Sequence, residues 1–380
     1  MQFKDVVGQE AVKHQLTQMV QKNRISHAQL LAGPEGCGNL GIALAFAQYV
    51  VCENKQANDS CGECPACIKT QKLVHPDIHF TYPVIRRNSS PSPSLSTDYI
   101  EEWRKIVLEK NAYFNVYDWL QFIGAENKQG NITVQECHAI IKKMNLRSYE
   151  SPYKIVIIWM PEYLGIEGNT LLKMIEEPPE KTIFLFVAHD QNKILSTILS
   201  RTQLLKIGSL QDVTIQKQLI DVFGIDNERA KKISYFANGN YTQALSILND
   251  DDVSDQNSSP EYFLRVCHQN DFSLFVQWAE EVAKKGREQQ KNFLIYTLHF
   301  FRELLLLSVG YNQNPKLLGN ELDYALEHKD KYSIAQISTI VKWLEKAHYH
   351  IERNANPKIL FLNLAIKTRK LLVVKKVAKV

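Results

Sequence analysis

Three short, largely apolar runs stand out in the first half of the chain, at residues 27–32, 153–158 and 182–188. Runs of this length without polar alternation are typical of strands buried on both faces of a parallel sheet. Segments with helical patterning lie between them, and helix and strand signals alternate to about residue 207. The pattern predicts an α/β domain over residues 1–208, with a parallel sheet and crossover helices.

The second half of the chain has no strand-like pattern. Residues 209–250 predict a small helical domain, and residues 261–380 predict a larger all-helical domain. The polar stretch 249–260 contains a run of aspartates and ends in proline, which is typical of a linker. The sequence therefore predicts three parts in the order α/β, small helical and large helical.

Composition narrows the class of protein. The 380 residues are 44% hydrophobic and 23% charged, which is ordinary for a soluble protein. The formal net charge of +4 is too small to indicate nucleic-acid binding by itself. The most apolar stretch, 294–309, is short and contains charged side chains, so we expect a buried or interface helix and no membrane span. The first residues lack the apolar core of a signal peptide, and we expect a cytoplasmic protein.

A glycine-rich loop, GPEGCGNL, follows the first predicted strand and precedes a segment rich in helix formers. Gly33, Gly36 and Gly38 provide the glycines with which a phosphate-binding loop wraps its backbone N–H groups around phosphate. Asn39 stands where such a loop carries lysine, and Leu40 stands where it carries the Ser/Thr that holds Mg²⁺. The loop is thus a degenerate phosphate loop, or else an ordinary strand–turn–helix connection that uses glycines for tight turns.

A second feature of active ATPases is missing at the end of the strand predicted at 153–158. In an active ATPase the acidic residues of the metal site stand at the end of such a strand. Here Trp159, Met160 and Pro161 follow the apolar run, and Glu162 is the one acidic residue nearby. Both observations argue against a functional ATP site in this chain.

Four cysteines lie within sixteen residues and have the spacing C-x8-C-x2-C-x2-C. Four thiolates complete a closed tetrahedral zinc shell, which leaves no position for water and is therefore structural. Disulfides, a redox Cys-x-x-Cys pair and part of an iron–sulfur motif are the competing interpretations. We predict a structural zinc knuckle over residues 52–67, with the ligands Cys52, Cys61, Cys64 and Cys67. The isolated cysteines Cys37, Cys137 and Cys267 are expected to be buried as small apolar residues.

Residues 98–122 are unusually rich in aromatic side chains. Aromatic rings can stack on single-stranded bases, but lysine and arginine do not alternate with these rings after Lys110. Packing within the protein is therefore the favoured interpretation. The aromatic residues are Tyr99, Trp103, Tyr113, Phe114, Tyr117, Trp119 and Phe122.

Several motifs together resemble one family. The opening F-x-x-V-V-G-Q-E at 3–10, the box LLKMIEEPP at 171–179 and the box STILSRT at 196–202 resemble the clamp-loader ATPases of the AAA+ class. The four-cysteine insertion after the phosphate-loop helix is also a mark of bacterial clamp loaders. The resemblance covers about residues 1–250 with specific motifs. It implies an AAA+-type parallel sheet with a P-loop-like core, a small helical lid at 209–250 and an all-α collar for oligomerisation at 261–380.

The missing lysine, Ser/Thr and acidic residues make the chain similar to the delta-prime group of DNA polymerase III rather than to the motor subunits. This resemblance implies a non-hydrolysing stator in a hetero-oligomer that loads a sliding clamp onto primer-template DNA. Its partners would be the motor subunits and the delta subunit. Arg201 would be an arginine finger that acts on a neighbouring subunit's ATP, and zinc would be the structural cofactor.

The chain departs from the family pattern at some positions. Thr202 replaces the usual cysteine, and neither Thr242 nor Gln243 supplies the sensing arginine of the motor subunits. Two other functions remain as alternatives: an ATP-hydrolysing motor with a variant loop, and a zinc-knuckle protein that binds single-stranded DNA. The latter would use residues 98–122 and the basic C-terminal residues.

Overall fold

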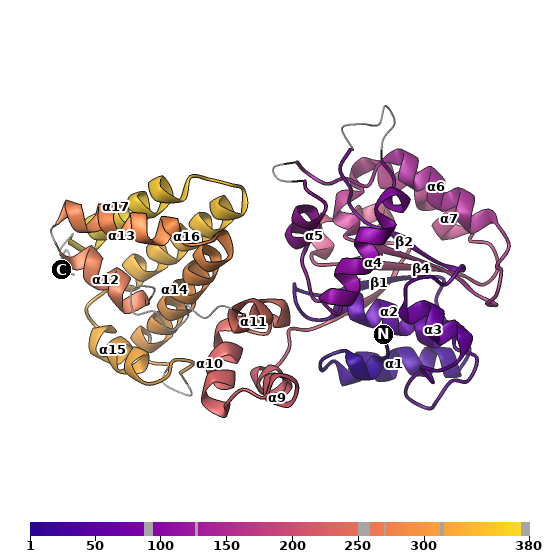
Figure 1. Ribbon diagram of the computed structural model, residues 1–380, viewed down its shortest axis with the longest axis horizontal. Helices are drawn as coiled ribbons and strands as arrows, with labels where there is room; N and C mark the ends of the chain where they lie inside the picture. The colour runs from indigo at the N-terminus through magenta and orange to yellow at the C-terminus, as the bar shows by residue number, and fades with distance from the viewer. Residues whose placement is uncertain (87–93, 126–127, 250–258, 270, 312–314, 374–380) are drawn as a thin grey trace. The chain divides into compact units, whose positions relative to one another are not determined.

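The computed structural model describes residues 1–86, 94–125, 128–249, 259–269, 271–311 and 315–373 (Figure 1). The chain divides into two compact units. Unit 1 comprises Met1–Gln218 with Gly239–Thr242, and unit 2 comprises Leu219–Asn238 with Gln243–Val380. The boundary passes through the predicted lid, so the division into three parts stays a prediction. Most of the linker predicted at 249–260 lies outside the described residues.

Unit 1 is built on a five-stranded sheet in which every pairing is parallel, with the strand order β2-β3-β4-β1-β5. This confirms the predicted α/β class and parallel sheet. The three predicted apolar runs became the central strands β1, β3 and β4, and the sequence pattern did not reveal the two edge strands. The strands are β1 (Ala28–Ala32), β2 (Ile78–Thr81), β3 (Lys154–Trp159), β4 (Thr182–Ala188) and β5 (Gln203–Lys206).

Helices cover both faces of this sheet, because alternate side chains of each central strand point to opposite faces. Ile155 and Ile157 of β3 pack with α2, α4 and α5, whereas Val156 and Ile158 pack with α6, α7 and α8. The helices of unit 1 are α1 (Glu10–Gln21), α2 (Asn39–Val51), α3 (Pro65–Gln71), α4 (Ile100–Glu109), α5 (Val116–Phe122), α6 (Val134–Asn145), α7 (Leu172–Glu176), α8 (Ser196–Leu199) and most of α9 (Asp212–Phe223).

Short 3₁₀ helices complete the connections of unit 1. They are η1 (Phe3–Asp5), η2 (Ser96–Tyr99), η3 (Pro161–Tyr163), η4 (Gly165–Leu171) and η5 (Gln191–Lys193). The helices η3 and η5 follow the strands β3 and β4, and η2 and η4 directly precede the helices α4 and α7. The start of α6 shows how local sequence sets a boundary. The Thr133 side chain accepts a hydrogen bond from the Glu136 N–H, which caps the helix, and the Glu136 carboxylate accepts from the Ser96 N–H.

The aromatic residues of 98–122 form a cluster against the sheet. The Trp103 ring stacks on Tyr82 with a centroid distance of 4.1 Å, and it contacts Trp119 at 5.3 Å and Trp159 at 5.2 Å. Trp103, Trp119 and Trp159 are fully buried. The packing interpretation is confirmed for the cluster, and it explains why a tryptophan ends β3: the Trp159 ring packs against Trp103 of α4.

Every secondary-structure element in the described residues of unit 2 is a helix, as predicted. The apolar stretch at 294–309 lies in the long helix α14, whose Phe300, Phe301 and Leu304 are fully buried in the core of the unit. This confirms the expected buried helix. Besides α14 (Arg287–Ser308), the unit contains α10 (Asn227–Ala237), most of α11 (Tyr241–Leu248), α12 (Pro260–His268), α13 (Phe272–Lys284), α15 (Asn320–His328), α16 (Ile334–Glu352) and α17 (Pro357–Val373).

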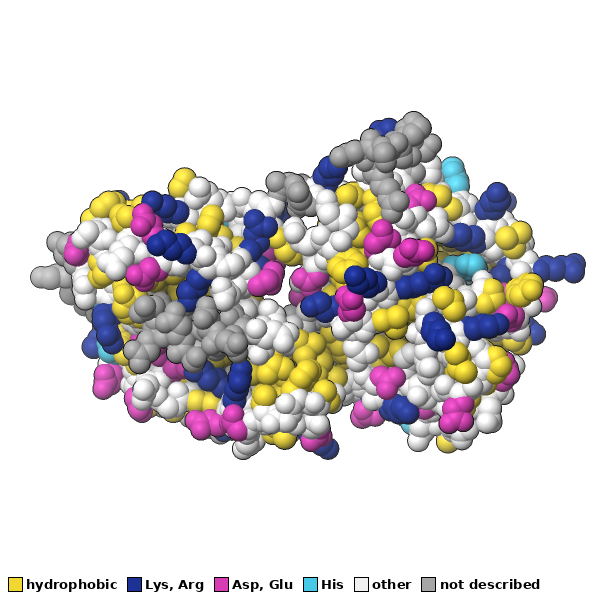
Figure 2. Space-filling model, in the orientation of Figure 1, with side chains coloured by type: hydrophobic (Ala, Val, Ile, Leu, Met, Phe, Trp, Pro, Cys, Tyr) yellow, Lys and Arg dark blue, Asp and Glu magenta, His cyan; other side chains and the backbone are white. Residues whose placement is uncertain are grey.

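The surface carries both signs of charge. Figure 2 shows acidic and basic side chains interspersed over the visible face, as the small net charge leads one to expect. None of the helices in the described part of the chain is long and apolar enough to cross a membrane.

The burial of the aromatic cluster leads to a prediction about stability. Replacing a fully buried large aromatic side chain by alanine removes its contacts and leaves a cavity. We expect Trp103→Ala to lower the free energy of unfolding by about 3–5 kcal/mol in urea titrations. The half-exposed Phe122 on α5 provides the control, and Phe122→Ala should cost less than about 1 kcal/mol. A loss for Trp103→Ala as small as that of the control would contradict the packing role.

Candidate functional site: a closed phosphate loop, an exposed arginine and a cysteine cluster

The glycine loop connects β1 to α2, so the predicted order of strand, loop and helix is confirmed. Gly36 and Gly38 have positive φ values of 72° and 89°, which glycine adopts without steric cost. The loop lies at the carboxyl end of the central strand β1, the edge at which open parallel sheets bind ligands. Its backbone therefore has the setting of a phosphate loop.

The side chain of Asn39 is directed into the protein. Its amide nitrogen donates a hydrogen bond to the Ala188 carbonyl at the end of β4 (3.0 Å), and its oxygen accepts from the Leu40 N–H (2.9 Å). Asn39 is only 4% exposed and Leu40 is also buried. The two residues that replace lysine and Ser/Thr thus belong to the core, and Asn39 uses one of the loop's own N–H donors.

Other side chains of unit 1 cover the loop from outside. Asn240 lies directly against Gly36, where a Cβ atom would come within 1.8 Å of its side-chain oxygen. The Tyr241 N–H donates to the Gly36 carbonyl (3.1 Å), and the Tyr241 ring meets the Tyr113 ring edge-on at 4.8 Å. The Tyr113 hydroxyl is held near Gly38 and accepts from the Val7 N–H (2.9 Å). Protein atoms therefore occupy the mouth of the loop.

The acidic residue after β3 also has a structural contact. One carboxylate oxygen of Glu162 accepts from the N–H groups of His189 (2.6 Å) and Asp190 (2.9 Å), which follow β4. A cavity of about 650 Å³ lies beside these residues, and Lys193 is also in its lining. Burial lowers the pKa of His189, so its imidazole is neutral at pH 7. Glu162 thus stabilises the loop that follows β4.

Arg201 lies between α8 and β5. Its Nε donates to the Glu176 carboxylate at the end of α7, and its Nη1 donates to the Thr197 carbonyl (3.0 Å) and the Ser200 hydroxyl (3.0 Å). The side chains of Arg201 and Glu176 are 35% and 46% exposed. An exposed pair of this kind contributes about 1 kcal/mol or less, so the guanidinium is positioned without being fixed. The structure brings together the two boxes 171–179 and 196–202.

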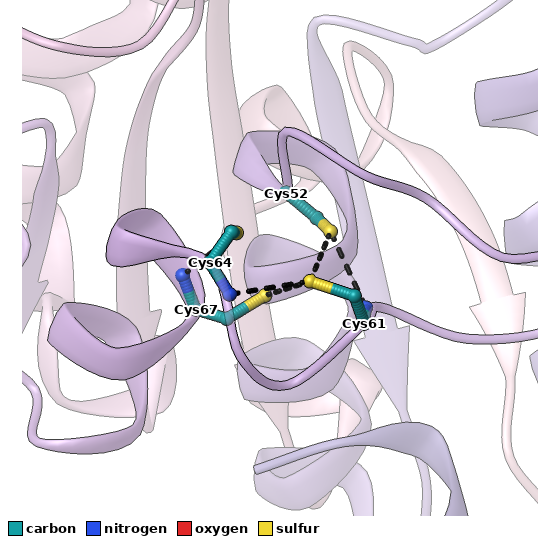
Figure 3. A group of neighbouring side chains, drawn as sticks. All are labelled: Cys52, Cys61, Cys64 and Cys67. Atoms are coloured by element: carbon teal, nitrogen blue, oxygen red, sulfur yellow. Dashed lines mark hydrogen bonds between the residues drawn. The ribbon is translucent and has the colours of Figure 1, made fainter.

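The four clustered cysteines converge in space (Figure 3). Their sulfur atoms all lie within 4.8 Å of one another, with Cys52 and Cys61 at 3.6 Å and Cys61 and Cys67 at 3.9 Å. Zn–S bonds of about 2.3 Å in a tetrahedron place the sulfur atoms about 3.8 Å apart. The donor set and its dimensions therefore fit a tetrahedral metal ion. The free thiols of the cluster also exclude a disulfide in this structure.

Backbone groups around the cluster favour thiolates. The N–H groups of Cys61, Cys64 and Cys67 each lie 3.4 Å from the sulfur of another cysteine in the cluster. Backbone donors from Glu63 and Cys64 lower the pKa of the Cys61 thiol to about 6. Burial raises the pKa of Cys67, which would be protonated without a cation nearby. A bound metal ion supplies the charge that keeps all four ligands deprotonated.

The knuckle also organises neighbouring backbone. Asp59 accepts hydrogen bonds from the N–H groups of Phe3 and Lys4, each at 3.0 Å, and Gln2 donates to the Ser60 carbonyl at 2.6 Å. The cysteines lie at the end of α2, in the following loop and in α3, so the cluster connects these elements to η1. Cys37, Cys137 and Cys267 are buried away from it, as expected.

Some residues of this region escaped the sequence analysis. Tyr113 and Asn240 come from parts of the chain about 75 and 200 positions from the loop, and no local pattern connects them to it. Glu176 belongs to a recognised box, but its contact with Arg201 is visible only in the fold. The replacement of the phosphate-loop lysine by Asn39 and of the Ser/Thr by Leu40 is visible in the sequence itself.

The fold and the loop define an AAA+-type α/β domain whose phosphate loop lacks the reactive side chains and is closed by the chain itself. The family model described as "DNA polymerase III, delta subunit" matches residues 8–211, more than half of the chain, and the chain belongs to that family. It is a subunit of the DNA polymerase III clamp-loader family, which confirms the resemblance.

Curated relatives agree with this assignment. The tau subunit of DNA polymerase III from Bacillus subtilis is 25% identical over 96% of this chain, which spans 61% of the length of tau. The delta-prime subunit of the same organism is 23% identical, with 90% of this chain and 92% of that protein covered. Among solved structures, a gamma-subunit-related protein of Thermotoga maritima has a TM-score of 0.42 at 14% identity, covering 95% of this chain and 99% of that one.

The buried amide of Asn39 provides a test of the closed loop. Asn39→Ala leaves the Leu40 N–H without its partner and removes one of the two hydrogen bonds to the Ala188 carbonyl, which still accepts from the Gly33 N–H. This should cost about 1–3 kcal/mol of unfolding free energy. The exposed Asn145 at the end of α6 is the matched control, and Asn145→Ala should change stability by about 0.5 kcal/mol or less. Equal stabilities of the two variants in urea titrations would show that the amide does not hold the loop.

Proposed function

We propose that this chain is a non-hydrolysing subunit of the DNA polymerase III clamp loader, which helps to load a sliding clamp onto primed DNA. The observation that carries the proposal is the phosphate loop. Asn39 and Leu40 are turned into the core, and the chain's own side chains fill the mouth of the loop. A loop closed in this way supports structure rather than phosphate chemistry. Among the clamp-loader relatives, this favours the delta-prime group over the tau and gamma subunits.

The second part of the proposal assigns Arg201 as an arginine finger that contacts the ATP of a neighbouring subunit. A guanidinium is always charged and can bind two phosphate oxygens at once. Arginine fingers stabilise the charge that develops on the transferred phosphoryl group. The half-exposed position of Arg201 supports this role, because its pairing with Glu176 costs little to open. The chain would then take part in catalysis only in another subunit's site.

The partners follow from the same assignment. The motor subunits and the delta subunit would contact this chain in a hetero-oligomer, and the clamp and primer-template DNA would be reached through the complex. The all-helical residues 261–380 would serve as the collar through which the subunits assemble. Most of the aromatic rings that the single-stranded DNA alternative requires are buried, so they are not available to stack on bases.

We also propose that Cys52, Cys61, Cys64 and Cys67 hold one structural zinc ion. Four sulfur ligands with tetrahedral spacing leave no open position for water or substrate. The segment 53–63 contributes little to the apolar core, so the metal would stabilise the knuckle and the backbone that hydrogen-bonds to it.

The finger is tested in a reconstituted clamp loader in which only the neighbouring ATP site keeps its phosphate-loop lysine. Loss of an arginine finger costs roughly a thousandfold or more in turnover. We expect Arg201→Ala to lower the DNA- and clamp-stimulated ATPase rate by about that factor, and Arg201→Lys to restore only part of it, because a lysine lacks the planar fork. The exposed Arg147 gives a matched control, and Arg147→Ala should keep the native rate. An unchanged rate in Arg201→Ala would refute the finger.

The non-hydrolysing role is tested by the isolated chain in the same assay. No Mg-ATP turnover above the background is expected, because neither a phosphate-loop lysine nor a magnesium ligand is present. ATPase activity that copurifies with the chain would establish the motor alternative instead, provided that it disappears in Gly36→Val. The valine side chain blocks the loop.

The zinc site is tested by elemental analysis of the purified chain. We expect about one zinc per chain in the native protein and almost none in the double variant Cys61→Ser/Cys64→Ser. Chelation should lower the melting temperature of the native protein and leave that of the double variant unchanged. Cys267→Ala, which removes a buried cysteine of unit 2, is the control and should retain the metal. Native protein without metal and insensitive to chelation would rule out the site.

A further inference from the structure

A second cavity of unit 1 lies at the free edge of the sheet, beside β2. It has a volume of about 260 Å³ and lies between the start of β2, α4 and the last turns of α6. Because β2 is the outermost strand in the sheet order, no further strand of the described residues covers this side. The polar and ionisable side chains in the lining are His75, His79, Thr97, Arg104 and Lys143. The lining contains no acidic side chain.

Arg104 and Lys143 are the two permanent cations of this cavity. In the part of the chain that the structure describes, neither Arg104 nor Lys143 forms an ion pair. The Arg104 Nε donates to the Leu73 carbonyl (3.0 Å), which fixes the side chain on the wall of the cavity. Both residues are half-buried, so their charges are less screened than those of fully exposed side chains. The two charged side chains in the lining of the cavity are therefore both positive.

His75 adds a directional donor. It is 4% exposed, and its Nδ1 accepts a hydrogen bond from the Asp77 N–H (3.2 Å). An accepting Nδ1 places the proton of the neutral ring on Nε2. Among the described residues this buried Nε2 has no hydrogen-bond partner. A buried donor without an acceptor is costly, which suggests that a ligand supplies the acceptor.

Asp77 lies close to the histidines but does not line the cavity. Burial raises the pKa of its carboxyl, but hydrogen bonds from the N–H groups of Tyr149 (2.5 Å), Glu150 (2.7 Å) and Ser151 (2.7 Å) hold that pKa below the ordinary value. Asp77 is therefore ionised, and its charge offsets part of the positive charge of the cavity. Burial and the neighbouring Lys143 lower the pKa of His79 to about 4, so its ring is neutral at pH 7 and can donate a hydrogen bond.

We propose that this cavity, formed by His75, His79, Arg104 and Lys143, binds a phosphate group. Phosphate oxygens suit a set of donors that combines an arginine fork, a lysine and imidazole N–H groups. The phosphate belongs either to a free phosphomonoester or to the end of a DNA strand. The site is separate from the glycine loop and from Arg201, and its existence does not depend on the proposed clamp-loader role.

Calorimetry of the full chain with inorganic phosphate, at constant ionic strength and pH 7, tests the site. We expect saturable binding that weakens at least tenfold in Lys143→Met. The adjacent exposed Lys142 on α6 gives the matched control, and Lys142→Met should bind as the native chain does. NMR signals of the histidine rings locate the ligand, because bound phosphate should raise the pKa of His79. Absence of saturable binding, or equal binding by the two lysine variants, would overturn the proposal.

Two further ligands distinguish the sources of the phosphate. A single-stranded oligonucleotide with a 5′-phosphate is compared with the same oligonucleotide ending in a 5′-hydroxyl, and adenosine monophosphate is titrated in parallel. Binding of the 5′-phosphorylated strand that is at least tenfold tighter than that of the 5′-hydroxyl strand would identify a strand end. Binding of inorganic phosphate and the monophosphate, with no preference between the strands, would identify a free phosphomonoester. If Lys143→Met bound every ligand as tightly as the native chain does, both sources of the phosphate would be refuted.

Discussion

The hydrogen bond from the Asn39 amide to the Ala188 carbonyl joins the first turn of α2 to the end of β4. The Asn39 side chain is buried and its amide requires an acceptor, which keeps the first turn of α2 against the sheet. The Ala188 carbonyl also accepts a hydrogen bond from the Gly33 N–H (3.1 Å). The covering contacts of Asn240, Tyr241 and Tyr113 depend on a loop held in this position. In the proposed non-hydrolysing role, these contacts would hold the loop in place of a bound nucleotide, while the fold keeps the shape of an ATPase domain.

This arrangement separates two properties that an ATPase combines. Asn39 lies in the buried interior of unit 1, whereas the candidate catalytic group, Arg201, lies at the surface in a weak ion pair with Glu176. In the proposed role, such a subunit would contribute rigidity from one part of its fold and a single charge from another. The segment that contains Glu176 would then serve the neighbouring subunit as well as the chain, because it orients the Arg201 guanidinium.

The parts of this protein that could be predicted from the sequence are those set by local pattern. Central strands such as β4 are continuous apolar runs, and the lost lysine is visible as Asn39 in a loop with fixed spacing. The edge strands β2 and β5 have four residues each and mixed polarity, so nothing in the sequence distinguished them from loops. The closure of the phosphate loop and the role of Trp159 depend on contacts between distant segments, and sequence periodicity carries no record of those. The cysteine cluster was predictable because its ligands are close together in the chain.

The hydrogen bonds from Phe3 and Lys4 to Asp59 have a consequence for local opening of the protein. Structural elements that share such contacts open together as a unit. The first residues of the chain and the cysteine loop therefore form one cooperative element, although more than fifty positions separate them in sequence. Protection of the Phe3 and Lys4 amides against hydrogen exchange then reports on the integrity of the cysteine loop. A protease that cleaves near the amino terminus would, for the same reason, act as a sensor of the state of that loop.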